Sequence, residues 1–288
     1  MASILIPLGL AILMVAVGLE TRLSDFRALV GAPRAVALGL IVQIVGLPLL
    51  AAQLAAIFAL PAPHAVGLVL LAAAPGGVTA NFVTLMARGD VALSVTLTVA
   101  TSLAAPLTVP LWVGWAFARF ADESVAVAMP FAPTIGAIFL TTVLPLVIGV
   151  SIAHRRPEFA LVAKTWARRV STIVFLVIVT AAVAAQWSAL RASGLSIGPA
   201  TLAFDLVALA VVIATSVLLR LPRPRTAALI QTTGLRNVAV ALTVAVTLLG
   251  RPDVAVAATV YVAVMNAVAL LHVAWTRSRL SNVKDETP

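Results

Sequence analysis

The chain has 288 residues, of which 62% are hydrophobic and only 10% are charged, and its formal net charge is +9. Soluble domains carry about a quarter charged residues, so this composition excludes an ordinary soluble domain and predicts an all-α polytopic membrane protein. The sequence has no cysteine and three His residues. This excludes disulfides and thiolate metal sites and leaves no zinc motif, so we expect no resident cofactor.

Nine segments are apolar over the roughly 20 residues that a spanning helix needs. In chain order they cover residues 2–19, 35–60, 65–86, 91–118, 132–153, 168–187, 199–220, 225–249 and 252–277. The first lacks the basic region and the cleavage site of a signal peptide, so we interpret it as a spanning helix. The longest loop, 154–167, divides a single transmembrane domain into a first half, 1–153, and a second half, 154–288.

The distribution of basic residues predicts the orientation of the chain. Most of the 19 Lys and Arg residues lie in the segments that follow the first, third, fifth, seventh and ninth apolar stretches. Loops rich in Lys and Arg stay in the cytoplasm. We therefore expect a protein of the plasma membrane or the bacterial inner membrane, with its N-terminus outside and its C-terminus in the cytoplasm. This arrangement accounts for the positive charge without a nucleic-acid partner.

Two of the apolar segments contain residues that interrupt a helix. The third contains Pro75-Gly76-Gly77, and the eighth contains the stretch TTGLRN at 232–237. A single Pro-Gly pair could be a simple kink, because such residues are common in membrane helices. Interruptions at corresponding places in two halves instead point to the binding site of a secondary transporter. Unwound backbone inside a bilayer has to line a cavity or bind something.

The residues around the two interruptions predict what binds there. Helix N-termini suit anions, whereas backbone carbonyls and hydroxyls suit a small cation. We expect the substrate to bind where the two interrupted helices meet. The predicted substrate-binding residues are Thr79, Asn81, Arg236 and Asn237.

Four stretches of the sequence together resemble the bile acid:sodium symporter family. They read MVAVGLETRLSDF at 14–26, APGGVTANFVTLMARGDVALSVTLT at 74–98, TTGLRN at 232–237 and VMNAVALLHVAW at 264–275. The resemblance runs over nearly the whole chain. It implies nine or ten spans in inverted repeats, a core and a panel domain, and two broken helices that cross near the membrane centre. It also implies transport of an organic anion, bile acid-like or a small carboxylate, usually with two sodium ions.

The resemblance also implies sodium ligands at particular positions. Asn81, Ser94 and Thr98 match the first sodium site of the family, and Gln43 matches a side-chain ligand of the second. Ser94 and Thr98 are four residues apart, so their hydroxyls lie on one side of a helix. Sodium is therefore a possible transported ion, and its coupling depends on the second interruption.

The second interruption departs from the family pattern. Thr232 stands where the family has a Glu shared by both sodium ions, and Arg236 stands where it has a Gln. Ala80 likewise replaces a Ser ligand. At about 4 Å and an effective dielectric of about 20, two unit charges repel by about 4 kcal/mol, which weakens binding of a cation about a thousandfold. We therefore expect that transport does not require two sodium ions.

An ionisable residue inside a span is expensive and needs a partner. The acidic residue well inside a span is Asp205, one apolar segment before Arg236. Three readings stay open: an Asp205–Arg236 ion pair that replaces sodium, an Asp205 that titrates and couples protons, and an unpaired Arg236 that lines a water-filled cavity.

Two other function classes compete with a transporter. A membrane enzyme would need a catalytic motif, and the chain shows no His-Asp-Ser grouping, metal motif or phosphate loop, so we predict that it is not an enzyme. A sensor or channel that kept the fold and lost the pump is the second alternative. The sequence indicates neither the identity of the substrate nor the oligomeric state.

Overall fold

A computed structural model describes residues 2–77, 79–121, 131–185 and 187–285. Nearly all of these residues are helical, and the part of the chain described contains no strand beyond one isolated bridge between Gly76 and Arg236. The all-α class is therefore confirmed. Residues 122–130, which we predicted to form a loop on the outer side of the membrane, are not among the described residues.

The helices follow the apolar segments of the sequence, with short π-helical turns (η2, η3, η4) and one 3₁₀ turn (η1) between them. In chain order they are α1 (Ala2–Glu20), η1 (Leu23–Arg27), α2 (Ala28–Gly31), α3 (Pro33–Ile41), η2 (Val42–Gly46), α4 (Leu47–Ile57), α5 (Ala62–Ala73), α6 (Thr79–Met86), α7 (Val91–Phe120), α8 (Phe131–Ile138), η3 (Phe139–Val143), α9 (Leu144–Arg155), α10 (Pro157–Ala185), α11 (Trp187–Leu218), α12 (Arg223–Gly234), α13 (Val238–Leu242), η4 (Thr243–Leu248) and α14 (Val256–Asp285).

Five helical stretches are long and apolar enough to cross a membrane, counted over the described residues. They are Pro33–Ile57, Val91–Phe120, Phe131–Arg155, Ser196–Leu218 and Val256–Thr276. A sixth is added if Ile6–Glu20 and Leu23–Gly31, which are bent by 72°, count as one span. The two interrupted segments contain only shorter apolar helices, among them Ala62–Ala73 and Val238–Leu248. The nine spans remain a prediction.

The structure corrects the loop predicted between the fifth and sixth apolar segments. No long loop covers 154–167, because α9 continues to Arg155 and α10 begins at Pro157. Proline favours the first turn of a helix, where its missing N–H has no partner to lose. Helix α11 likewise begins at Trp187, well before the predicted start of its span at 199.

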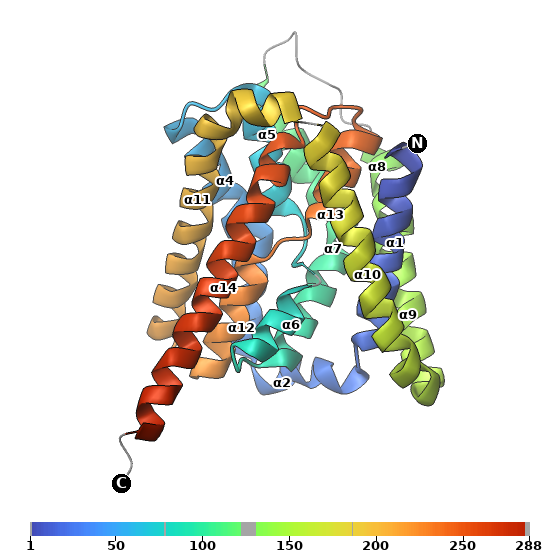
Figure 1. The fold of residues 1–288 in the computed structure, drawn as a ribbon, viewed down its shortest axis with the longest axis vertical. Helices are drawn as coiled ribbons and strands as arrows, with labels where there is room; N and C mark the ends of the chain where they lie inside the picture. The colour runs from blue at the N-terminus through green and yellow to red at the C-terminus, as the bar shows by residue number, and fades with distance from the viewer. Residues whose placement is uncertain (1, 78, 122–130, 186, 286–288) are drawn as a thin grey trace.

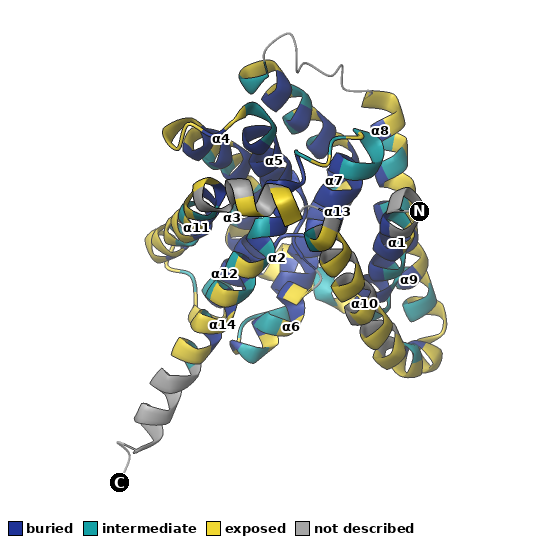
Figure 2. Cartoon of the chain, turned by 45° about the horizontal axis from the view of Figure 1, so that its top comes forward, coloured by how far each residue is buried: buried dark blue, intermediate teal, exposed yellow. Residues whose placement is uncertain are grey.

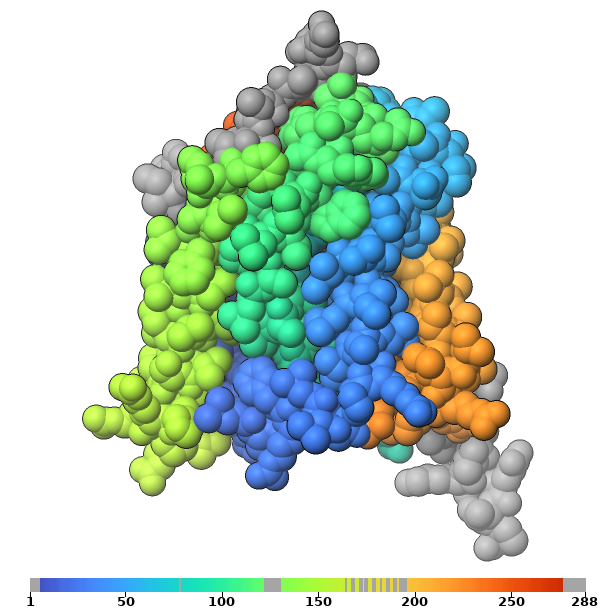
Figure 3. Space-filling model, turned by 180° about the vertical axis from the view of Figure 1, so that it is seen from behind, coloured from blue at the N-terminus to red at the C-terminus, as the bar shows by residue number. Residues whose placement is uncertain are grey.

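The helices form two groups that lie side by side (Figure 1). In one group α1 packs against α9 and α10, and in the other α11 packs against α12, α14 and α4, with α5 against α4 and α7. The segment from η1 to α2 crosses below α7 (Figure 3) and is fastened there by a hydrogen bond of 2.9 Å from the Thr96 hydroxyl to the Asp25 carbonyl.

The short helices of the second group are buried, whereas the outer helices expose apolar side chains. Residues 64–73 of α5, residues 227–234 of α12 and all of α13 are buried (Figure 2). Outer helices expose large apolar side chains such as Ile41, Leu107 and Val217. An exposed apolar exterior around a buried interior is the arrangement that lipid favours. The two interrupted helices therefore lie in the interior of the molecule.

Candidate functional site

The two interrupted helices cross and bond to each other through their unwound backbone. The Gly77 N–H donates to the Leu235 carbonyl at 2.7 Å, and the Asn237 N–H donates to the Pro75 carbonyl at 2.9 Å. These bonds form an antiparallel bridge between Gly76 and Arg236. Each break thereby satisfies polar groups of the other, which would cost several kcal/mol each if left unpaired inside a membrane.

The close approach of the two breaks explains one glycine of the first. A Cβ atom at Gly77 would lie 2.9 Å from the Arg236 carbonyl oxygen and 3.1 Å from that of Leu235, closer than ordinary Cβ contacts allow. At Gly76 the nearest atoms would be the Thr98 hydroxyl at 3.4 Å, the Gln43 side-chain oxygen at 3.5 Å and the Thr232 carbonyl at 3.5 Å. Gly77 is therefore required by packing, and Gly76 is surrounded by oxygen atoms from three elements.

The residues predicted to form the first sodium site contact one another. The Asn81 side-chain oxygen accepts hydrogen bonds from the Ser94 hydroxyl at 2.7 Å and from the Thr98 hydroxyl at 3.5 Å. Ser94 and Thr98 are fully buried, and Asn81 is buried at the start of α6. Three neutral oxygen atoms from α6 and α7 therefore converge, without a carboxylate. Such a set suits at most a weakly held cation.

The second predicted sodium position contains the guanidinium of Arg236. Its Nη1 donates to the Gln43 side-chain oxygen at 3.1 Å, and its Nη2 donates to the carbonyls of Ala72, at 2.9 Å, and Ala74. These carbonyls belong to the C-terminal end of α5, where a helix carries partial negative charge. Arg236 is 2% exposed. The residues at this position fit a fixed guanidinium and do not fit a second cation.

The Thr232 hydroxyl does not supply a cation ligand in place of the Glu carboxylate that the resemblance implies at this position. Its hydroxyl donates to carbonyls of its own helix, Ala228 at 2.9 Å and Leu229 at 3.3 Å. This back-bonding is the usual way for Thr to satisfy its hydroxyl inside a helix. The helix continues to Gly234, so the second break is shorter than the predicted stretch 232–237.

The remaining predicted substrate residues lie in different surroundings. Asn237 is buried and caps α13, since its side-chain oxygen accepts from the Val240 N–H at 3.3 Å. Its side-chain nitrogen has no hydrogen-bond partner within the described part of the chain. Thr79 begins α6 and is exposed. The structure therefore gathers Asn81, Arg236 and Asn237 around the crossing and leaves the Thr79 side chain outside it.

The ion pair between Asp205 and Arg236 is not formed among the described residues. Asp205 Oδ1 instead lies 2.8 Å from the Tyr261 hydroxyl oxygen, and the same hydroxyl lies 2.6 Å from the Gly234 carbonyl oxygen. Sequence reasoning missed Tyr261. It is the only tyrosine of the chain, and a polar ring in the last apolar segment was the available signal.

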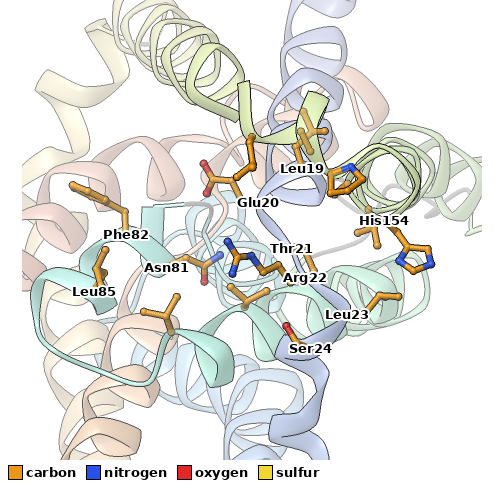
Figure 4. A pocket seen from close by; sticks show the side chains of 17 residues that line it. Leu19, Glu20, Thr21, Arg22, Leu23, Ser24, Asn81, Phe82, Leu85 and His154 are labelled. Atoms are coloured by element: carbon orange, nitrogen blue, oxygen red, sulfur yellow. The ribbon is translucent and has the colours of Figure 1, made fainter. Parts of the chain in front are cut away.

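A cavity of about 650 Å³ lies beside the crossing, between the two groups of helices (Figure 4). One wall comes from α1, η1, α9 and α10, and the opposite wall comes from α6 and α7. Its polar lining consists of Glu20, Thr21, Arg22, Ser24, Asn81 and His154, and its apolar lining of Leu19, Leu23, Phe82, Leu85, Val91, Val95, Val150, Ala153, Pro157, Ala160 and Leu161. Arg22 and Asn81 project toward each other in Figure 4. Thr79, Arg236 and Asn237 do not line this cavity.

Comparison with known proteins matches residues 7–193 to the model of the Sodium Bile acid symporter family. The chain belongs to this family. The match confirms the resemblance drawn from the sequence, and two of the four stretches, at 14–26 and 74–98, lie inside it. It covers the first break, with Asn81, Ser94 and Thr98, and it ends before the second break, where the chain departs from the expected ligands.

Individual members of the Sodium Bile acid symporter family are similar over part of the chain. An uncharacterized sodium-dependent transporter, YocS, of Bacillus subtilis is 34% identical over 196 residues, which cover 67% of this chain and 58% of YocS. The probable sodium/metabolite cotransporter BASS1 of Arabidopsis thaliana is 38% identical over 36% of this chain and 26% of its own length. Sodium/bile acid cotransporter 4 of the mouse is 29% identical over 61% of this chain and 40% of its own length.

Proposed function

We propose that this protein is a secondary transporter of a small organic anion, bile acid-like or a carboxylate, in which Arg236 takes the place of the second sodium ion. The observation that carries the proposal is the guanidinium held by Gln43 and by the carbonyl end of α5. Half-helix C-termini of transporters coordinate the coupling cation. A cation that belongs to the chain stabilises the crossing in the same way, without binding from solution.

The fixed charge also changes the energetics of transport. An arginine does not lose its proton in a protein, and it cannot be released on the other side of the membrane. It therefore supports the negative substrate electrostatically but draws no energy from a sodium gradient. Asn81, Ser94 and Thr98 retain neutral oxygens but no carboxylate, and we propose that transport does not depend on a sodium ion bound there.

The cavity supports an amphipathic anion as the substrate. Its lining combines a large apolar surface with Arg22 and Asn81 at one end. Guanidinium groups bind carboxylates and sulfonates with charge-assisted hydrogen bonds, and ligand sites are mostly apolar with a few polar groups that orient the ligand. We propose that the anionic group binds between Arg22 and Asn81, with the apolar body against α6, α7 and α10.

The two groups of helices would act as the panel and core domains of the family. In this proposal α1, α9 and α10 form the panel, and the group with the crossing forms the core. The cavity lies between them, as expected for alternating access by relative movement of two bodies. We propose that its mouth faces the cytoplasm, because Arg22, Arg155 and Arg156 lie on the basic side of the chain.

Uptake into proteoliposomes tests the proposal. Labelled taurocholate serves as the bile acid probe and labelled lactate as the short carboxylate. We expect saturable uptake of at least one of them, competed by the unlabelled compound, and a strong reduction in Asn81→Ala. Thr108→Ala is a matched control, because Thr108 is a polar residue of α7 that bonds only within its own helix at 3.2 Å.

The outcome also separates a carrier from the alternatives. A channel on the same fold would conduct without saturation, and a sensor would bind the anion without flux. Binding of both probes without saturable flux would contradict the transport function and favour the sensor.

A further inference from the structure

Three buried polar groups, the Asp205 carboxyl, the Tyr261 hydroxyl and the Gly234 carbonyl, lie in hydrogen-bonding contact beside the second break. The Tyr261 hydroxyl lies 2.8 Å from Asp205 Oδ1 and 2.6 Å from the carbonyl oxygen of Gly234, the last residue of α12. Asp205 and Tyr261 are both 0% exposed. The second carboxyl oxygen, Oδ2, has no hydrogen-bond partner among the residues that the structure describes. The three groups come from α11, α14 and α12, so they join three helices at one point.

The protonation of Asp205 can be argued from the number of hydrogens that Asp205, Tyr261 and the Gly234 carbonyl share. A tyrosine hydroxyl has one hydrogen, an ionised carboxylate has none, and a carbonyl only accepts. With an ionised Asp205, Tyr261 could satisfy either the carboxylate or the Gly234 carbonyl, and the other close contact would have no hydrogen. With a protonated Asp205, the carboxyl donates to the Tyr261 oxygen, and Tyr261 donates to Gly234. A protonated Asp205 therefore satisfies both close contacts, whereas an ionised Asp205 leaves one of them without a hydrogen.

Among the described residues, the helices packed against Asp205 place no cation in contact with its carboxyl group. Helix α11 packs against α12, α14 and α4, and also contacts α10, which ends at Ala185. Residues 47–57 of α4 include no titratable side chain, and the charged residues of α10 lie between 158 and 169, in the half away from α11. On α11 itself the other charged residue is Arg191, about 21 Å away at 1.5 Å per residue.

The titratable groups of α12 and α14 are turned elsewhere. Arg223 and Arg225 occupy the first turn of α12, about 14–16 Å from its last residue. The charge of Arg236 acts on Tyr261, but its guanidinium donates to Gln43 and α5. On α14 the next titratable residue after Tyr261 is His272, about 16 Å along the helix, and its ring contacts Gln231 at 2.6 Å. A buried charge without a partner is costly, so Asp205 can ionise only in a different conformation.

We propose that Asp205 is the proton-binding site of this transporter and that Tyr261 transmits its protonation state to the second break. Loss of the proton breaks the Asp205 O–H bond and passes the proton to a water molecule, and the reverse step forms the bond again. The carboxylate then accepts the single Tyr261 hydrogen, because charged acceptors form the stronger bond. The Gly234 carbonyl loses its partner at the helix end, two residues before Arg236.

The inference rests on the proposed function and extends it, because it makes the proton the coupling ion. Arg236 keeps its charge throughout the transport cycle, so it cannot couple transport to an ion gradient. Asp205 can bind a proton on one side of the membrane and release it on the other. Neutral Asp205 fixes the end of α12 and with it the Arg236 and Asn237 backbone at the crossing. Deprotonation frees this end and favours the opposite conformation of the carrier.

Infrared difference spectroscopy of the purified protein tests the proton site without any substrate. We expect the C=O band of a protonated carboxylic acid at neutral pH in the native protein, its loss as the pH is raised, and its absence in Asp205→Asn. Tyr261→Phe retains Asp205 but removes its partner, so the band should shift in frequency. No band that depends on Asp205, a band that persists at every pH, or an unshifted band in Tyr261→Phe would each overturn the proposal. If Asp205→Asn fails to fold, Tyr261→Phe decides the question alone.

Taurocholate flux tests the coupling, because its sulfonate stays ionised when a pH gradient is applied. In Asp205→Asn, which keeps the size and a donor group, we expect accumulation driven by the pH gradient, divided by the rate of exchange at equal pH, to fall strongly. A ratio equal to that of the native protein would overturn the proposal. A native protein that carries neither taurocholate nor lactate would instead contradict the proposed function, while the infrared bands still decide whether Asp205 binds the proton.

Discussion

Arg236 donates a hydrogen bond of 3.1 Å to the Gln43 side-chain oxygen, although the two residues are 193 positions apart in the chain. Gln43 lies in the π-helical turn η2, and Arg236 lies in the unwound second break. Turns of this kind, with one extra residue, often occur at functional sites. The same turn directs the Ile44 carbonyl toward the Trp112 ring nitrogen, which donates to it at 2.7 Å. The guanidinium of Arg236 thus occupies the position predicted for the second sodium ion.

The orientation of the chain can be tested at the junction of α9 and α10. A cysteine in place of Glu158 would be the only one in the chain, and this position is exposed, whereas Ala160 is buried in the cavity wall. We expect an impermeant maleimide to label Glu158→Cys only after the cells are permeabilised, because the basic loops stay inside. Labelling in intact cells would reverse the proposed topology, and the cysteine-free protein is the control.

Gly77→Ala should destabilise the crossing. The added methyl group would lie 2.9 Å from the Arg236 carbonyl oxygen, in a backbone that is bonded on both sides. Overpacking of this kind costs about 1–3 kcal/mol, so we expect a lower Tm in detergent. Gly136→Ala is the control, since nothing lies within 4 Å of its added atom and it is exposed on α8. A Tm for Gly77→Ala equal to that of Gly136→Ala would contradict the packing described for the breaks.

Arg22→Gln should weaken binding of the anion. Charge-assisted hydrogen bonds contribute about 1.5–3 kcal/mol, which corresponds to an increase in KM of about tenfold or more, with the maximal rate less affected. Arg27→Gln removes the same charge from η1 at a position that does not line the cavity. Concentration dependence of taurocholate and lactate uptake gives both constants. Equal KM values in the two variants would show that the anionic group binds elsewhere.

The helical architecture followed from features that the sequence displays directly. Long apolar runs predicted the helices, and Pro75, Gly76 and Gly77 predicted the first break, because these residues disfavour a helix interior through missing donors or excess freedom. The short connection between α9 and α10 was not predictable in the same way. The basic residues near 154–169 suggested a loop, but charged side chains also fit the exposed start of α10.

The hydrogen-bond partners of Arg236 and Asp205 could not be predicted from the sequence. Arg236 binds the carbonyls of Ala72 and Ala74, and every residue has a carbonyl, so no residue type marks such a partner. The search for an acidic partner led to Asp205, which bonds to Tyr261 instead. Helical spacing predicted that the Ser94 and Thr98 hydroxyls lie on one face, and the family resemblance implied that they group with Asn81. Their contact with Asn81 needed the fold.

The most direct test of the central claim is the initial rate of taurocholate influx into proteoliposomes with sodium replaced by choline at constant pH. If the guanidinium of Arg236 stands in for a bound sodium ion, the native protein should keep its rate in choline, and Arg236→Gln should lose it. A large loss of rate in the native protein on removal of sodium would contradict the account, because it would show that the ion still binds despite the fixed charge.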